Sequence, residues 1–330
     1  MGRIRGTAPT PGAVLRTLGA ASLALGWCLL AACPTLLGAG CQSGAPTVQE
    51  QAAGLEIRAV DASASPMAAF EARAALLGIE IIEAAEDGRV IAGRRMPVPP
   101  QSSARLLFEA RFFDPHGAEH PLPFPGRLQD ARFSPTPSRS MALLDDQDVL
   151  YLWKGPGDEP RRVDGGVFAG FAFSGSGGML AYSKGQAPEL DAYRYDLASG
   201  QSSRLTQVDA PVWGFGFSPD DSRIVYVDSR EGFPTLMTMA PDGSALAKLT
   251  NRGISAADVH AGASLAPVPD GRRPPLWGRR AIFVEDSIGV HAFDGQGRLL
   301  LSRPGARDLH RGKAADTILF RQDGRYWSTP

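Results

Sequence analysis

The sequence predicts an all-β fold, a β-propeller of about six four-stranded blades closed by an N-terminal latch strand and carrying a short N-terminal helix. Three observations lead to this prediction. A Phe-Ser phrase recurs at spacings of 40 and 44 residues, a short apolar strand follows each copy, and glycine-containing turns recur with a similar period. A period of about 40 residues with four short strands is typical of propeller blades, which bury both faces of each sheet by packing radially.

The composition of the 330 residues fits such a fold. The chain is 43% hydrophobic and 21% charged, as globular proteins are, and its 38 glycines and 27 prolines suit many tight turns. The formal net charge is −1, which does not indicate the basic stripe of a nucleic-acid-binding protein. All three cysteines lie before residue 42, so a disulfide framework or a cysteine-based metal site is excluded from the propeller.

The first 41 residues are similar to the signal peptide of a bacterial lipoprotein. Three arginines precede residue 17, no charged residue follows until residue 50, and 18–32 is an apolar run. Two cysteines are candidates for lipidation. Cys33 follows the more suitable Leu-Ala-Ala, whereas Cys41 is followed by the more suitable polar tether. A soluble secreted form and an intact membrane helix over 17–40 are the alternatives.

A flexible linker over 42–53, poor in apolar residues, is expected between the leader and the propeller at 54–330. Residues 55–60 then form the latch strand, which completes a last blade whose other strands lie in 306–330. Such pairing removes a sheet edge that would favour aggregation. A short helix over 66–77, with proline at its start and glycine after its end, connects the latch to the first blade.

The remaining five blades are expected over 75–125, 127–164, 168–207, 211–250 and 255–303. The Phe-Ser phrase occurs in the second, third and fourth of these blades, at Phe133, Phe173 and Phe217. In the fourth blade it is preceded by alternating glycine and phenylalanine, which favours close packing of neighbouring blades. This blade resembles the TolB-type propeller repeat, because Phe-Ser-Pro-Asp, an apolar strand, Pro-Asp-Gly and Leu-Thr follow one another. The resemblance implies a TolB-like propeller with periplasmic partners.

Few residues of the predicted propeller suggest chemistry. His260 and His310, with Asp258 and Asp308 near them, fall close to the starts of their blades, where strands line the central funnel. They form a candidate ligand site, although buried structural histidines are commoner in proteins. The sequence contains no serine-hydrolase elbow, phosphate-binding loop or dinucleotide fingerprint. We therefore expect no catalytic residue, no metal site and no cofactor.

Together these features predict a non-enzymatic, monomeric propeller that is lipid-anchored on the periplasmic side of the bacterial outer membrane. It would be a scaffold that binds envelope proteins and no nucleic acid. The alternative is a propeller hydrolase or lyase, or a carbohydrate- or peptide-binding protein, with a ligand site in the central funnel. Clustered polar side chains in the funnel favour the alternative, and an apolar plug favours the scaffold.

Overall fold

The computed structural model describes residues 55–98, 106–135, 139–186, 189–208, 211–231, 234–250, 274–286, 289–312 and 317–329. All of them belong to the unit that spans 44–330. The predicted leader, with Cys33 and Cys41, and the linker lie outside the described residues, as do Asp258 and His260. No helix in the described part of the chain is long and apolar enough to cross a membrane.

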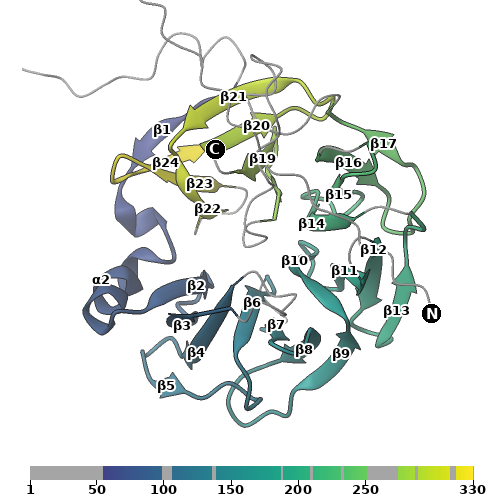
Figure 1. The fold of residues 1–330 in the computed structure, drawn as a ribbon. Coiled ribbons are helices and arrows are strands. Elements are labelled where there is room, and N and C mark those ends of the chain that lie inside the picture. Colours follow the sequence, from purple (N-terminus) through teal and green to yellow (C-terminus); the bar gives the residue numbers. More distant parts are fainter. Residues whose placement is uncertain are drawn as a thin grey trace, which may run out of the picture. The chain divides into compact units, whose positions relative to one another are not determined.

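The described strands form six four-stranded antiparallel blades, in agreement with the prediction. Four blades are separate sheets, and blades 1 and 2 are joined by the single pair Phe108↔Leu128. Figure 1 shows the blades of this unit set around a common centre. Within each of blades 1 to 5, the chain runs from the innermost strand to the outermost strand.

The strands of blades 1 to 3 are β2 (Glu80–Ala84), β3 (Val90–Met96), β4 (Leu107–Phe113) and β5 (Glu119–His120), then β6 (Leu128–Phe133), β7 (Met141–Asp145), β8 (Val149–Trp153) and β9 (Arg161–Gly165), then β10 (Val167–Phe173), β11 (Met179–Gln186), β12 (Glu189–Asp196) and β13 (Gln201–Arg204). Those of blades 4 to 6 are β14 (Val212–Phe217), β15 (Ile224–Asp228), β16 (Thr235–Met239) and β17 (Ala247–Lys248), then β18 (Leu276–Trp277), β19 (Ile282–Glu285), β20 (Gly289–Phe293) and β21 (Leu299–Pro304), then β22 (Arg307–Arg311), β23 (Ile318–Gln322), β24 (Arg325–Thr329) and β1 (Arg58–Val60).

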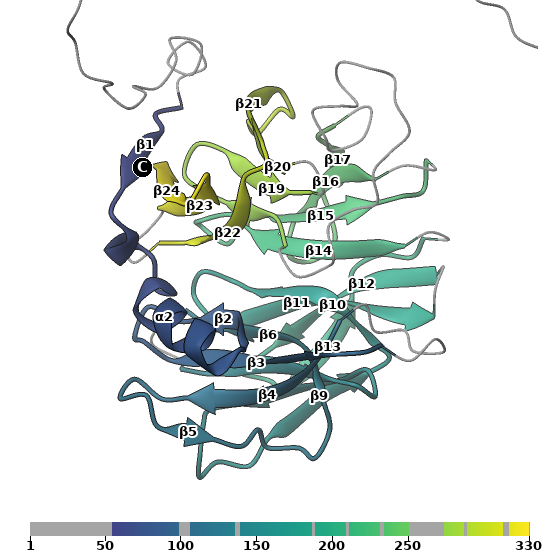
Figure 2. The same ribbon diagram turned by 60° about the vertical axis from the view of Figure 1, so that its left-hand side comes forward.

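The latch is the outermost strand of blade 6, as the sequence predicts. Strand β1 pairs antiparallel with β24, and Arg58, Ala59 and Val60 lie opposite Ser328, Trp327 and Tyr326 respectively. Figure 2 shows β1 running beside β24. Just before β1, Leu55 and Ile57 are buried in the core between blades 5 and 6. The two ends of the described chain therefore meet in one sheet.

The hydrophobic core is divided among the contacts between consecutive blades. Separate clusters of buried side chains lie between blades 1 and 2, 2 and 3, 3 and 4, 4 and 5, and 5 and 6. Each cluster combines aliphatic and aromatic side chains from the facing sheets. This arrangement buries both faces of a blade, which a single four-stranded sheet could not do alone.

Between blades 6 and 1 the chain places a helix. After the short helix η1 (Ala62–Ala64), α2 (Ala68–Leu77) begins two residues later than predicted and ends at Gly78, whose φ of 62° suits glycine. Its Phe70 and Ala74 pack against Val90, Ala92 and Phe113 of blade 1. On the blade 6 side, the Tyr326 hydroxyl donates a hydrogen bond to Glu71 at 2.5 Å. The helix thus joins the first and last blades, with an apolar contact to blade 1 and polar contacts to blade 6.

Candidate functional site

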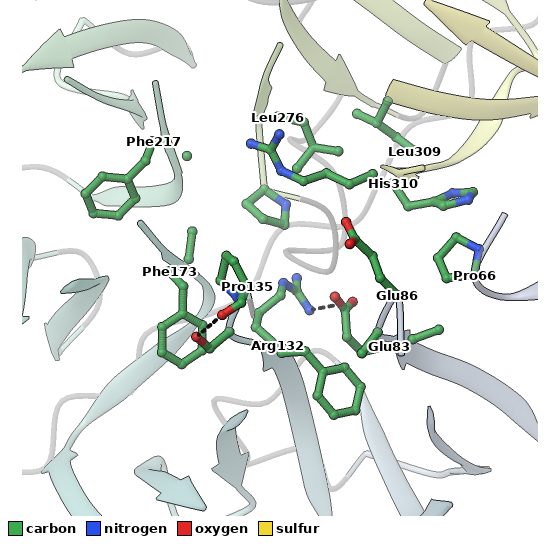
Figure 3. Close-up of a pocket in the computed structure, with 18 of the residues that line it drawn as sticks. Pro66, Glu83, Glu86, Arg132, Pro135, Phe173, Phe217, Leu276, Leu309 and His310 are labelled. Atoms are coloured by element: carbon green, nitrogen blue, oxygen red, sulfur yellow. Dashed lines mark hydrogen bonds and ion pairs between the residues drawn. The ribbon is translucent and has the colours of Figure 1, made fainter. Parts of the chain in front are cut away.

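The candidate site is a cavity of about 190 Å³ at the centre of the ring. It lies where the innermost strand of each blade ends, so that β2, β6, β10, β14, β18 and β22 all contribute to its wall. The loops that follow β2 and β6, and the segment before α2, complete the wall. Figure 3 shows side chains from several blades gathered around this space.

One hydrogen bond recurs at the same place in all six described blades. The residue directly after the innermost strand donates its backbone N–H, over 2.8 to 2.9 Å, to a carbonyl at the start of the second strand. The donors are Ala85, Ser134, Ser174, Ser218, Gly278 and Gly312. This bond aligns the six repeats residue by residue, including the three that lack the Phe-Ser phrase.

Counting back two residues from each donor gives one cavity-lining residue per blade. In the order of blades 1 to 6, these are Glu83, Arg132, Ala172, Gly216, Leu276 and His310. Because side chains on a strand alternate between its two faces, the same position in each repeat faces the same way. Blades 6, 1 and 2 supply the polar members of this ring, and blades 3, 4 and 5 supply the small and apolar members. The cavity therefore has a polar half and an apolar half.

Arg132 is the centre of the polar half. Its side chain is 9% exposed, and its Nη1 lies 2.5 Å from Oδ1 of Asp130 and 3.8 Å from Oε2 of Glu83. The Asp130 carboxylate is itself buried and accepts a hydrogen bond from the backbone N–H of Gly170 in blade 3 at 3.0 Å. A buried guanidinium needs such carboxylate partners to offset its lost hydration. Asp130 holds Arg132 in place while it links blade 2 to blade 3.

His310, one of the candidate funnel residues, lies in the wall of the cavity, and its ring is held on both sides. Its Nδ1 contacts the backbone carbonyl of Asp308, and its Nε2 lies 2.9 Å from the hydroxyl of Ser65. A carbonyl oxygen can only accept, so the network assigns the proton to Nδ1 and leaves Nε2 to accept from the serine. Ser65 is fully buried and also accepts from the N–H of Met67. This serine–histidine pair fastens the segment before α2 to blade 6.

The other predicted funnel residues do not join His310 in the described structure. Asp308 does not line the cavity; its carboxylate lies 2.8 Å from Nη2 of Arg321. The cause is a β-bulge between Arg307 and His310, at which Asp308 takes a φ of 61°. Asp258 and His260 lie outside the described residues.

The loop between β2 and β3 adds further charge to the polar half. Arg89 is buried, and its Nε donates to both carboxylate oxygens of Asp87. Its Nη1 donates to the Arg139 carbonyl at 2.6 Å, and its guanidinium lies 4.9 Å from the ring centre of Phe133. Glu86, in contrast, is exposed. Figure 3 shows the Glu83 and Glu86 side chains directed into the cavity.

The apolar half contains Phe173, Phe217 and Leu276, together with two prolines that precede β18. Gly216 is required here by close approach, because a Cβ atom at this position would lie 2.1 Å from the carbonyl oxygen of Pro275 in blade 5. This finding agrees with the close blade packing predicted from the alternation of glycine and phenylalanine.

Two residues of the polar half, Glu83 and Arg132, were not predicted from the sequence. Arg132 could have been recognised from the sequence. The residue before the phenylalanine of the Phe-Ser phrase is Arg132 in one repeat but Ala172 and Gly216 in the other two. A charged residue at a position that is otherwise small marks a departure from the repeat. Glu83 left no such signal, since blade 1 lacks the phrase that would have aligned it.

The described residues contain no group of three or more histidine, cysteine, aspartate or glutamate side chains that could hold a metal ion. The funnel is neither a purely polar cluster nor an apolar plug. It combines a half of each kind, which suits the binding of an amphipathic group.

Comparisons with known proteins yield structural likenesses only. No protein-family model matches the chain, and no curated protein matches it. Among solved structures, TolB from Acinetobacter baumannii is 15% identical with a TM-score of 0.47, over 78% of this chain and 67% of that one. A gluconolactonase from Xanthomonas campestris is 14% identical with a TM-score of 0.48, over 74% and 82%. A chain of a nidogen–laminin complex is 13% identical with a TM-score of 0.45, over 64% and 74%. The propeller assignment rests on the six blades of this chain itself.

Proposed function

We propose that this chain is a non-enzymatic binding protein of the bacterial cell envelope, which holds part of a partner protein in its central cavity. In this proposal the propeller is a monomer, tethered to the periplasmic side of the outer membrane through a lipid on Cys33 or Cys41. The observation that carries the proposal is the two-sided cavity, to which every blade contributes one residue at the same position of the repeat.

The contacts of the polar half support binding rather than catalysis. Arg132 is held by buried Asp130, and His310 uses both ring nitrogens in contacts with the protein. Ser65, which contacts His310, is fully buried, so its hydroxyl is not accessible to a substrate. Nucleophilic catalysis requires a serine that can reach the reacting atom, whereas polar groups held in place by contacts with the protein suit recognition.

The proposed location rests on the sequence. The arginine-containing start, the apolar run and the cysteines followed by a polar linker are the parts of a lipoprotein leader. The TolB-like repeat at 217–250 supports envelope partners by analogy with that family.

The binding role is tested by capture of partners from envelope extracts on the immobilised full-length chain. The variant Ala172→Phe adds a large side chain at the cavity wall, and we expect it to lose the proteins that the natural chain retains. The matched control is Ala198→Phe, because Ala198 is exposed in the turn before β13. Retention of the same proteins by all three chains, each with an intact melting transition, would contradict a role for the cavity.

The tether is tested separately by mass spectrometry of the mature protein purified from membranes. We expect an acylated cysteine at the new N-terminus, and Cys33→Ala and Cys41→Ala variants identify which of the two carries it. An N-terminus without acyl chains would refute the lipid anchor and leave the binding role untouched.

A further inference from the structure

The helix α2 is apolar on the side that faces the solvent as well as on the side that faces blade 1. Phe70 and Ala74 are buried against blade 1. Away from it, Ala72, Ala75 and Leu76 are exposed, and their spacing of three and four residues places them on one face of the helix. A surface helix usually carries polar or charged residues on its outer face, so α2 departs from the usual pattern.

Two neighbouring leucines make this face unusual within the protein. Three large apolar side chains are exposed in the described part of the chain, and two of them lie together at the end of α2. Leu76 is 89% exposed and Leu77 is 48% exposed, whereas the third, Leu246, lies before β17 in blade 4 and is 54% exposed. Single exposed leucines are common, but adjacent ones on an apolar face indicate a surface that contacts a partner.

We propose that the outer face of α2, which consists of Ala72, Ala75, Leu76 and Leu77, lies against the lipid bilayer to which the chain is tethered. This inference rests on the proposed lipid anchor. It adds a second contact with the membrane, which determines the side of the propeller that faces the bilayer.

The place of α2 in the chain favours a bilayer as the occupant of this face. The helix follows β1 after the short helix η1, and Figure 1 shows α2 and β1 at the outer rim of the ring. Leu55, the first described residue, comes 14 residues after Cys41 and 22 after Cys33. Even a fully extended chain of these lengths spans only about 50 Å and about 80 Å respectively. A lipid on either cysteine therefore keeps α2 close to the bilayer, where a weak contact can form.

The side chains of the outer face suit lipid better than a protein partner. They are alanine and leucine, whereas tryptophan, tyrosine and arginine dominate protein–protein contacts and leucine is under-represented among them. The neighbouring Arg73 is directed to blade 1, where its Nη1 donates to the Gly117 carbonyl at 2.8 Å and its guanidinium lies 5.2 Å from the ring centre of Phe113. An uncharged aliphatic face of this kind can enter the boundary between lipid headgroups and acyl chains.

The contact is tested with a fluorophore on the full-length chain, purified from membranes and reconstituted into vesicles of phosphatidylethanolamine and phosphatidylglycerol. A nitrobenzoxadiazole group is attached at Leu76→Cys, and the matched control carries it at Leu246→Cys, the exposed leucine of blade 4. The natural chain, treated in the same way, gives the signal of the three natural cysteines. We expect nitroxide-labelled lipids to quench the fluorophore at Leu76→Cys at least about twofold and to leave that at Leu246→Cys unchanged.

The leucine itself is tested by Leu76→Glu, with the fluorophore at Ala72→Cys on the same face. Because Leu76 is 89% exposed, this variant should keep the melting temperature of the natural chain. The added charge should reduce the quenching at Ala72→Cys at least about twofold, since a carboxylate opposes entry into the bilayer. The matched control Leu246→Glu should leave this quenching unchanged.

Equal quenching at Leu76→Cys and Leu246→Cys would overturn the membrane contact. An emission shift at Leu76→Cys that grows with protein concentration and resists quenching by nitroxide lipids would also overturn it, because a second copy of the chain would then cover the face. Mass spectrometry of the same sample reports the anchor separately. An acylated chain without quenching refutes the membrane contact alone, a quenched chain without acyl groups refutes the anchor alone, and a chain with neither refutes both.

Discussion

The latch offers the sharpest test of how the ring is closed. Leu55, Glu56, Ile57 and Arg58 alternate between the core and the solvent, and Ile57 is 3% exposed in the core between blades 5 and 6. The perturbation is Ile57→Ala, which removes three buried carbon atoms from this core. Replacements of a buried isoleucine by alanine cost about 2–5 kcal/mol of unfolding free energy. We take the lower half of this range, about 2–3 kcal/mol, because the site lies at the end of the described chain and can relax.

The assay is urea-induced unfolding followed by tryptophan fluorescence. The matched control is Glu56→Ala, the neighbouring residue whose side chain is 65% exposed and makes only a surface ion pair with Arg58 at 3.7 Å. Such surface changes alter stability by less than about 0.5 kcal/mol. With a slope of about 2–3 kcal/mol per molar urea, Ile57→Ala should lower the midpoint by about 1 M. A midpoint no lower than that of Glu56→Ala would refute the role of the latch.

Three further predictions concern single residues. Gly216→Ala is expected to lower the melting temperature sharply, because the added Cβ would lie 2.1 Å from a backbone oxygen of blade 5. The control Gly295→Ala, at a position with open space around it, should change the melting temperature little. Equal melting temperatures of the two variants would contradict the close approach. Asp130→Ala leaves Arg132 without its buried partner and should cost about 3–5 kcal/mol in chemical denaturation; a loss below about 1 kcal/mol would show that the pair does not hold the wall. Burial, with a hydrogen bond to a glutamate, raises the pKa of Tyr326 to about 12 from 10.0, so its contribution to stability is complete below pH 10 and is lost as the pH rises through 12. Melting temperatures measured over this range should fall less steeply for Tyr326→Phe than for the natural chain, and identical slopes would exclude this contribution.

The fold could be predicted from the sequence because every blade has the same physical requirements, and these recur along the chain. Strands of similar length and turn glycines recur with one period, and in the described structure Gly117 and Gly243 do adopt positive φ values of 81° and 85°. The latch followed from counting, since the last strands needed one partner and 55–60 was an apolar strand without a blade. The prediction for the helix was wrong only in its first two residues, which form a turn that leads into the helix.

The site was harder to predict, for a physical reason. The register at the end of each innermost strand decides which residue faces the cavity. In blades 1, 5 and 6, which lack the Phe-Ser phrase, this register is seen only from the backbone hydrogen bond after the strand. A β-bulge then turned Asp308 away while His310 kept its place. A bulge interrupts the alternation of side chains along a strand, so counting residues does not show which way Asp308 faces.

The contact between blades 6 and 1 has a consequence for how the ring assembles. The hydrogen bonds that join its two sides, Ser65 to His310 and Tyr326 to Glu71, span 245 and 255 residues of chain. Closing loops of this length costs about 5 kcal/mol of chain entropy, whereas consecutive blades meet over short connections. Blades 1 to 5 can therefore fold in order as an open arc. The ring closes last, when both ends of the chain come together. The same contact is where the circle should open first when the protein is stressed.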